Sequence, residues 1–227
     1  MPKGVKRYFR NRKRRSGAFK KRRRNARRLR LMKTPVPRTF CTKLKYHDQV
    51  SLQPIVGGAI NIYKYRANDC YDPNFTGIGH QPRGFDQLMA MYDHFVVIAS
   101  KIYVSYSTSP NATTAYTIGI ALRDSATSDD LNGYMESSYN RAKVVHAGGG
   151  GNETKWIGMK CNPNKFLGRS KPMADPELKG SVSASPAEGA YYHIYVDPYG
   201  SNTEPIEMNV TLEYTVVLLE PKNPGQS

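Results

Sequence analysis

The first 47 residues of this 227-residue chain contain no acidic residue, and the first one is Asp48. The same 47 residues carry 20 of the 34 lysines and arginines, so residues 48–227 hold 34 − 20 = 14 basic and 18 acidic residues. The formal charge of +16 is therefore the sum of a +20 segment and a remainder of 14 − 18 = −4. Such a segment cannot bury a core by itself, but it can neutralise a polyanion.

Cysteines and long apolar runs are also scarce. The three cysteines, Cys41, Cys70 and Cys161, are odd in number and widely spaced, which argues against a disulfide framework and fits a reducing compartment. No C-x-x-C or Cys/His spacing predicts structural zinc. The sequence contains no run of 18 apolar residues, so no membrane span is predicted. A secretory signal requires an apolar segment after the basic N-terminus, and none is present there. We therefore expect neither bound metal nor membrane insertion.

Three basic clusters, at residues 12–15, 20–24 and 27–30, dominate the N-terminal segment. Their mutual repulsion predicts that residues 1–38 form a disordered arm when free. Arginine outnumbers lysine there, which suits bidentate contacts with phosphate. Nuclear import alone requires only one or two such clusters, so nucleic-acid binding is the preferred interpretation, with nuclear localisation as a compatible second role. The residues predicted to serve both roles are Arg12, Lys13, Arg14, Arg15, Lys20, Lys21, Arg22, Arg23, Arg24, Arg27, Arg28 and Arg30.

The remainder of the chain has the pattern of a single domain of strands, residues 39–220, followed by a flexible tail, residues 221–227. Pro35 and Pro37 favour an extended hinge before it. Alternating or apolar runs predict eight strands. Eight antiparallel strands with long connections favour an all-β, two-sheet jelly roll over an up-and-down barrel. The predicted strands are residues 39–50, 59–66, 95–107, 115–123, 141–147, 153–161, 190–197 and 206–220.

Two connections carry more specific predictions. Residues 141–147 and 153–161 are expected to form a hairpin, joined by a flexible glycine-rich turn at residues 148–151. One helix is expected at residues 85–94, where Phe85, Leu88, Met89 and Tyr92 recur at helical spacing. The polar stretch before residue 140 predicts a loop with a helical turn near residues 130–134, and residues 162–189 predict a loop.

Catalytic patterns are weak. Glu153-Thr-Lys155 and Glu177-Leu-Lys179 match the loose acid-x-Lys sequence of some metal-dependent nucleases, but no partner aspartate accompanies them. The glycine run at residues 148–151 lacks the Lys-Ser/Thr of a phosphate-binding loop. The five histidines are scattered and form no known nucleophile pattern. We therefore expect no enzyme activity, no catalytic residue and no cofactor. The histidines are His47, His80, His94, His146 and His193.

Two further features allow a structural and a binding interpretation. Pro82 and Gly84 favour a turn before the expected helix, with Arg83 paired to a carboxylate, and a ligand site is the less favoured alternative. Trp156 alternates with Lys155 and Ile157 on a predicted strand. It is expected to pack in the core or at an interface, with base stacking as the weaker alternative.

The sequence from Gly79 to Phe95, GHQPRGFDQLMAMYDHF, resembles the HQPRGFDQ…Y region of capsid proteins of circular, Rep-encoding single-stranded DNA viruses, the circovirus-like group. Outside residues 79–95 the resemblance depends on the order of arm, proline hinge and strands. It implies a T=1 shell of sixty copies whose arms hold circular single-stranded DNA. It also implies host nuclear import receptors and a host-cell surface receptor as partners, and a location in the virion and, during assembly, the host nucleus.

Three alternatives remain. A coat protein of a small RNA virus or satellite would carry a similar arm, because phosphate contacts carry little base information. A ribosomal or chromatin-type binding module predicts basic residues on the folded body too, which the charge of −4 opposes. A nuclease predicts clustered carboxylates, and the sequence does not contain them.

Overall fold

The structure is a computed structural model that describes residues 36–55, 59–146, 154–200 and 204–223. They belong to one compact unit formed by residues 34–227. The twelve arm residues predicted to bind nucleic acid lie outside the described residues, as do the expected glycine-rich turn at residues 148–151 and residues 224–227 of the tail.

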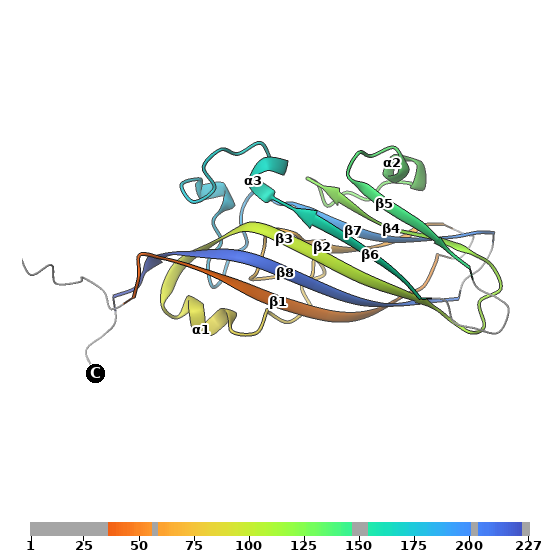
Figure 1. Cartoon of the computed structure of the whole chain (residues 1–227), viewed down its shortest axis with the longest axis horizontal. Coiled ribbons are helices and arrows are strands. Elements are labelled where there is room, and N and C mark those ends of the chain that lie inside the picture. The colour runs from red at the N-terminus through yellow and green to blue at the C-terminus, as the bar shows by residue number, and fades with distance from the viewer. Residues whose placement is uncertain (1–35, 56–58, 147–153, 201–203, 224–227) are drawn as a thin grey trace, which may run out of the picture. The chain divides into compact units, whose positions relative to one another are not determined.

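Two four-stranded antiparallel sheets pack face to face around one core (Figure 1). The first sheet has the order β1-β8-β3-β6, with strands Thr39–Leu52, Ile206–Pro221, Tyr92–Thr108 and Thr154–Cys161. The second has the order β2-β7-β4-β5, with strands Asn61–Arg66, Tyr191–Pro198, Tyr116–Arg123 and Asn140–Val145. This is the eight-stranded antiparallel jelly roll that the strand pattern predicted.

Buried tyrosines connect the two sheets through their hydroxyl groups. The Tyr106 hydroxyl on β3 donates to the carbonyl oxygen of Gly119 on β4 at 2.8 Å. The Tyr214 hydroxyl on β8 donates to the carbonyl oxygen of Arg66 on β2 at 2.7 Å. A buried hydroxyl without a hydrogen-bond partner costs free energy. These bonds therefore favour one alignment of the two sheets, in addition to the apolar packing between them.

The helix prediction was wrong at its C-terminal end. Helix α1 spans Phe85–Met89, and Tyr92 already begins β3, so Asp93 and His94 belong to a strand. Tyr92 pairs with Pro221 of β8, and this sheet pairing outweighs the local helical periodicity. The burial implied by the periodicity is nevertheless confirmed for Phe85, Met89 and Tyr92, while Leu88 is partly buried.

The predicted hairpin of residues 141–147 and 153–161 was also wrong. β5 pairs with β4 and β6 pairs with β3, so the two strands are edges of different sheets. Strand alternation specifies a buried face but does not specify a partner, so it fits either arrangement. Side chains join the two edges: Arg141 donates to the carbonyl oxygen of Gly158 at 2.9 Å, and Lys143 donates to that of Trp156 at 2.8 Å.

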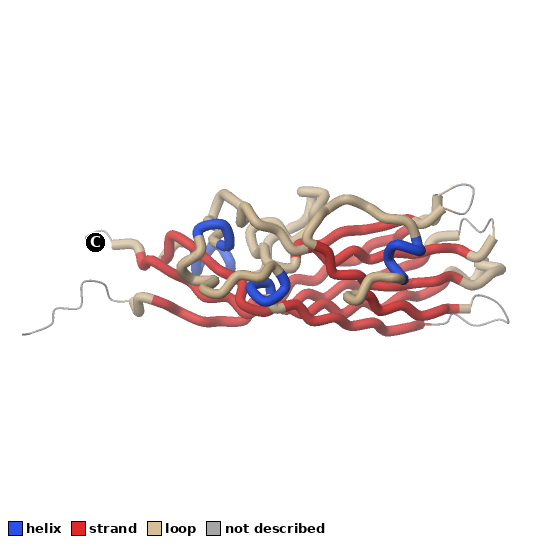
Figure 2. The backbone as a smooth tube through the Cα atoms, turned by 90° about the horizontal axis from the view of Figure 1, so that it is seen from above, coloured by secondary structure: helices blue, strands red, loops and turns tan. Residues whose placement is uncertain are grey.

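Short helices lie in the connections, and the strands run along a common direction (Figure 2). The predicted turn near residues 130–134 is confirmed as α2, Leu131–Met135, whose first turn is capped by Asp130 accepting from the Gly133 amide at 2.8 Å. The expected loop at residues 162–189 contains α3, Pro163–Phe166, and a 3₁₀ turn, Pro176–Leu178. No helix in the described ranges is long and apolar enough to cross a bilayer.

Candidate nucleic-acid interface

The point where the arm joins the body is held at one end of the first sheet. Thr39 at the start of β1 pairs with Leu219 near the end of β8, and both strand ends lie together in Figure 1. The Tyr92 hydroxyl donates to the carbonyl oxygen of Pro37 at 3.0 Å. Tyr92 is only 2% exposed, so this bond fixes the hinge against the core. The described part of the hinge is thus anchored by a residue of the 79–95 segment.

The turn at residues 80–84 has the structural features that the sequence predicted. Pro82 is buried, and Gly84 has φ +87, a left-handed conformation that favours glycine. The His80 ring lies 4.5 Å from the Tyr46 ring, centroid to centroid. Arg83 is exposed and forms no ion pair within the described residues, so its predicted carboxylate partner was wrong. The segment acts here as a structural turn.

The two nitrogens of the His80 ring each lie 2.9 Å from a backbone carbonyl oxygen, one of His47 and one of Gln81. Neutral imidazole has one N–H donor, whereas imidazolium has two, so these carbonyls raise the pKa of His80 above its usual value. The nearby carboxylate of Asp48 acts in the same direction.

Aromatic packing joins the segment to β3. The rings of Phe85 and Phe95 meet edge to face at 5.4 Å. The backbones of Phe95 and Gly180 exchange two hydrogen bonds of 2.9 Å, and a Cβ on Gly180 would lie 2.3 Å from the Phe95 ring. The 79–95 segment therefore orders the loop beyond β6 as well as the arm's attachment.

Glu177 and Lys179, which match the nuclease-like sequence pattern, form ion pairs with other residues. Glu177 pairs with Arg169, and Lys179 pairs with Glu220 at 2.8 Å. Lys179 and His94 together lower the pKa of the Glu220 carboxyl group. Glu153, of the other match, lies outside the described residues. No group of three or more metal-ligating side chains gathers within the described part of the chain.

His193 is the one completely buried histidine of the described residues, and its surroundings are structural. Its Nδ1 lies 2.7 Å from the Tyr134 hydroxyl and its Nε2 lies 3.0 Å from the carbonyl oxygen of Ser125. Burial, with the nearby positive charge of Lys64 as a smaller cause, lowers the pKa of His193 to about 4. A neutral ring at pH 7 that connects α2 to β7 has a stabilising role.

One face of the first sheet presents aromatic and cationic groups outward. Trp156 was expected in the core or at an interface, and the structure excludes the core, because the residue is 63% exposed. Tyr103 on β3 is 41% exposed and faces the same side, opposite Gly158 of β6. Sequence reasoning missed Tyr103, although its position in the period-2 pattern, between the buried Ile102 and Val104, would have placed it outward.

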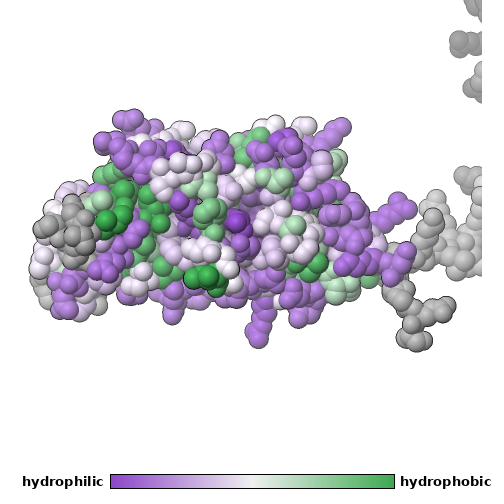
Figure 3. All heavy atoms as spheres, turned by 180° about the vertical axis from the view of Figure 1, so that it is seen from behind, coloured by the Kyte–Doolittle hydropathy of each residue, from purple (hydrophilic) through white to green (hydrophobic). Residues whose placement is uncertain are grey.

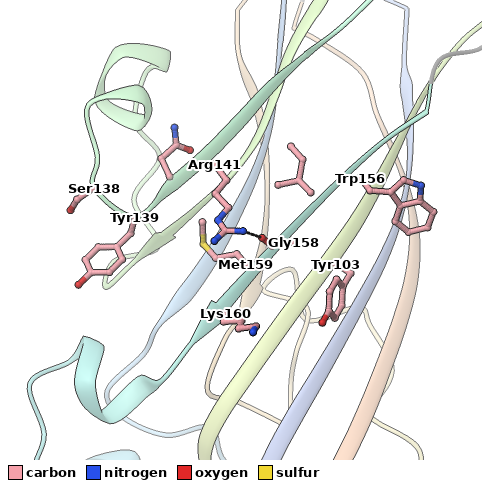
Figure 4. Close-up of a pocket in the computed structure, with 10 residues that line it drawn as sticks. Tyr103, Ser138, Tyr139, Arg141, Trp156, Gly158, Met159 and Lys160 are labelled. Carbon is pink, nitrogen blue, oxygen red and sulfur yellow. Dashed lines mark hydrogen bonds between the residues drawn. The ribbon is translucent and has the colours of Figure 1, made fainter.

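Four rows of paired residues cross the outward side of this sheet, and we call them the open face. The rows are Lys45-Glu213-Lys101-Lys160, His47-Thr211-Tyr103-Gly158, Gln49-Asn209-Ser105-Trp156 and Ser51-Glu207-Ser107-Thr154. The side of the molecule shown in Figure 3 is mostly hydrophilic, with apolar side chains in small separate patches. On the open face, the exposed rings of Tyr103 and Trp156 lie beside the polar and charged residues of these rows (Figure 4).

The comparisons with known proteins identify the fold. No protein-family model matches the chain, and no curated protein matches its sequence. The structure of tobacco necrosis virus matches with a TM-score of 0.50 and 13% identity, over 83% of this chain and 86% of that chain. The structure of mud crab tombus-like virus matches with a TM-score of 0.46 and 13% identity, over 83% and 85%. The BFDV capsid protein matches with a TM-score of 0.41 and 8% identity, over 81% and 100%.

At these identities the similarity establishes the fold alone. The chain has the two-sheet jelly roll found in the tobacco necrosis virus structure.

Proposed function

We propose that this protein is a viral coat protein that assembles into a small icosahedral shell and packages circular single-stranded DNA through its basic arm. The observation that carries the proposal is the combination of a viral jelly-roll fold with a charge of +20 on residues 1–47 and −4 on residues 48–227. The role is structural and requires no catalytic group. The fold provides the wall of the shell, and the arm provides the contact with the genome.

The charges support packaging quantitatively. Residues 1–38 hold 18 of the 20 basic residues, so sixty arms bring 60 × 18 positive charges, enough for roughly 1,080 phosphates if each pairs once. The body is mildly acidic, so its net charge does not attract the genome away from the arms. Apolar burial between subunits would drive assembly, and neutralisation of the arms by DNA would reduce their repulsion.

Nuclear targeting belongs to the same proposal. The clusters at residues 12–15, 20–24 and 27–30 suit recognition by host nuclear import receptors. The resemblance of residues 79–95 to circovirus-like capsid proteins favours DNA, a T=1 shell of sixty copies and attachment to a host-cell surface receptor. The protein would then be found in the virion and, during assembly, in the host nucleus.

A coat protein of a small RNA virus or satellite is the second candidate. The twelve basic arm residues would contact the phosphates of either nucleic acid in the same way. Nuclease sensitivity of the packaged material separates the two: protection of a DNase-sensitive, RNase-resistant molecule supports the first candidate, and the reverse result supports the second.

The first experiment compares the full chain with a variant that lacks residues 1–38. Both are examined by electron microscopy, and their absorbance is measured at 260 and 280 nm. Closed, uniform particles that carry nucleic acid only when the arm is present are the expected result. A soluble monomer that binds nucleic acid but forms no shell, over a range of salt and pH, would refute the coat-protein proposal in favour of a binding module.

A further inference from the structure

We propose that the open face of the first sheet is a second binding site for the packaged single-stranded DNA, with bases stacking on Tyr103 and Trp156. This inference depends on the proposed function, because it takes the genome as the ligand. The arm would supply charge contacts, and the open face would supply base contacts that the basic clusters lack.

The two rings lie on the same side of the sheet, on the neighbouring strands β3 and β6. Tyr103 lies opposite Gly158, and Trp156 lies two residues further along β6 on the same side. Such diagonal neighbours have Cα atoms about 7–8 Å apart. The Tyr103 ring lies close to Gly158: a Cβ on Gly158 would lie 3.1 Å from that ring. A cavity of about 530 Å³ lies between β6 and residues 138–141, and both rings and Gly158 contribute to its lining (Figure 4).

Both rings have faces available for stacking. Neither Tyr103 nor Trp156 takes part in the ring–ring or cation–π contacts of the described residues. Two other exposed aromatic side chains do: Phe75 lies against Tyr191, and Tyr139 lies against Phe166. A base offers a flat π-face to such a ring, and stacking does not require a particular sequence.

The charges beside the rings favour a polyanion. Lys101 and Lys160 are directly paired across β3 and β6, an arrangement of like charges that destabilises a sheet unless an anion lies near. The neighbouring carboxylate of Glu213 is bound by Lys45 at 3.5 Å. Lys101 and Lys160 form no ion pair within the described residues, so both ammonium groups can contact phosphates.

A second copy of the chain fits this face less well. The centres of protein–protein interfaces are depleted in lysine and contain contiguous apolar side chains. The open face has two paired lysines, and its other rows consist mainly of Ser, Thr, Asn and Gln. Aromatic rings beside unpaired cations are the combination that single-stranded nucleic acid recognises.

Trp156 is the only tryptophan of the chain, so its fluorescence reports on this site alone. The full-length protein is titrated with oligo(dT) and, in parallel, with inorganic polyphosphate of equal charge. We expect oligo(dT) to reduce the emission through stacking and polyphosphate to leave it unchanged, because polyphosphate occupies the arm without offering a base. Equal emission with both ligands would overturn the proposal.

Two variants test the geometry. Tyr103→Ala is expected to weaken oligo(dT) binding about 5- to 150-fold at high salt, where phosphate contacts of the arm are reduced. Gly158→Ala keeps both rings but adds a Cβ 3.1 Å from the Tyr103 ring, which must shift, and it should reduce the quenching of Trp156. Tyr199→Ala, which removes a tyrosine 51% exposed elsewhere, is the matched control and should leave both measurements unchanged. Thermal unfolding of each variant verifies that it is folded.

Failure of this site and failure of the proposed function give different results. A labelled oligo(dT) that binds by anisotropy without changing Trp156 emission would refute the site while leaving the arm's role intact. Absence of both binding and shells would refute the proposed function itself. A blue shift of Trp156 emission in shells assembled without nucleic acid would show that another subunit covers the ring, and it would refute the site.

Discussion

The hydroxyl of Tyr92 lies 3.0 Å from the carbonyl oxygen of Pro37, 55 residues earlier in the chain. Tyr92 is also the last apolar residue of the helical pattern from which residues 85–94 were predicted to be a helix. Its position at the start of β3 instead gives it access to the hinge. The 79–95 segment thus has a structural task that its resemblance to circovirus-like capsid proteins did not reveal: it holds the chain where the arm begins.

Replacing Tyr92 with phenylalanine should therefore loosen the hinge without removing the ring from the core. We expect a loss of about 1 kcal/mol in the free energy of unfolding, since the Pro37 carbonyl group loses its partner. Trypsin cleavage after Arg38, followed by mass spectrometry, should accelerate. Tyr103→Phe removes an exposed hydroxyl and is the control. Unchanged cleavage in Tyr92→Phe would mean that the hydrogen bond does not restrain the hinge.

The arm should determine the salt dependence of single-stranded DNA binding. Each phosphate contact on a single strand contributes about −0.7 to the slope of log K against log salt concentration. The double variant Arg27→Gln/Arg28→Gln is therefore expected to make the slope shallower by about 1.4. Lys165→Gln/Lys171→Gln removes two exposed charges from the body and should leave it unchanged. Equal slopes in all three proteins would exclude these arginines from phosphate contact.

Buried His193 should make the subunit less stable in mild acid. Its pKa is about 4 in the folded protein, below the ordinary value of 6.5, so the unfolded chain binds the extra proton between these pH values. The contribution of neutral His193 to the free energy of unfolding is fully present above pH 6.5 and is lost as the pH falls toward 4. The loss is roughly 3 kcal/mol at most.

Urea unfolding of dissociated subunits at pH 7 and pH 4.5 measures this effect. The free energy of unfolding should differ less between pH 7 and pH 4.5 in His193→Asn. The full difference should persist in His47→Gln, which removes an exposed histidine. If His193→Asn retains the full pH dependence, other groups are responsible for it.

Gly119 on β4 leaves room for a tyrosine ring. A Cβ at this position would lie 2.2 Å from Tyr195, whose ring stacks on Tyr134 at 5.0 Å. Gly119→Ala should destabilise the subunit by about 1–3 kcal/mol through overpacking. In Gly119→Ala/Tyr195→Leu the clash is removed, so the combined loss should be smaller than the sum of the two single losses. Additive losses, measured by urea unfolding, would contradict this contact.

The sequence predicted the strands better than it predicted their partners. On β8, the apolar residues from Ile206 to Leu218 alternate, and every one of them is buried as expected. β5 and β6 show the same kind of alternation, yet they lie in different sheets, because period 2 identifies a buried face and contains no information about the neighbouring strand. The core position considered for Trp156 was wrong for a related reason: the residue lies on the outward face of β6, where an apolar side chain remains exposed in the subunit.

The sequence by itself determined the charge asymmetry, the number and approximate limits of the strands, and the all-β class, because composition and periodicity are local properties. Only the tertiary structure decided the partners of the strands and the place of Tyr92 beside Pro37. It also decided the juxtaposition of Tyr103 with Trp156, which are 53 residues apart in sequence. These relationships join segments distant in the chain, and their free energy comes from sheet pairing and core packing, which no local window of residues contains.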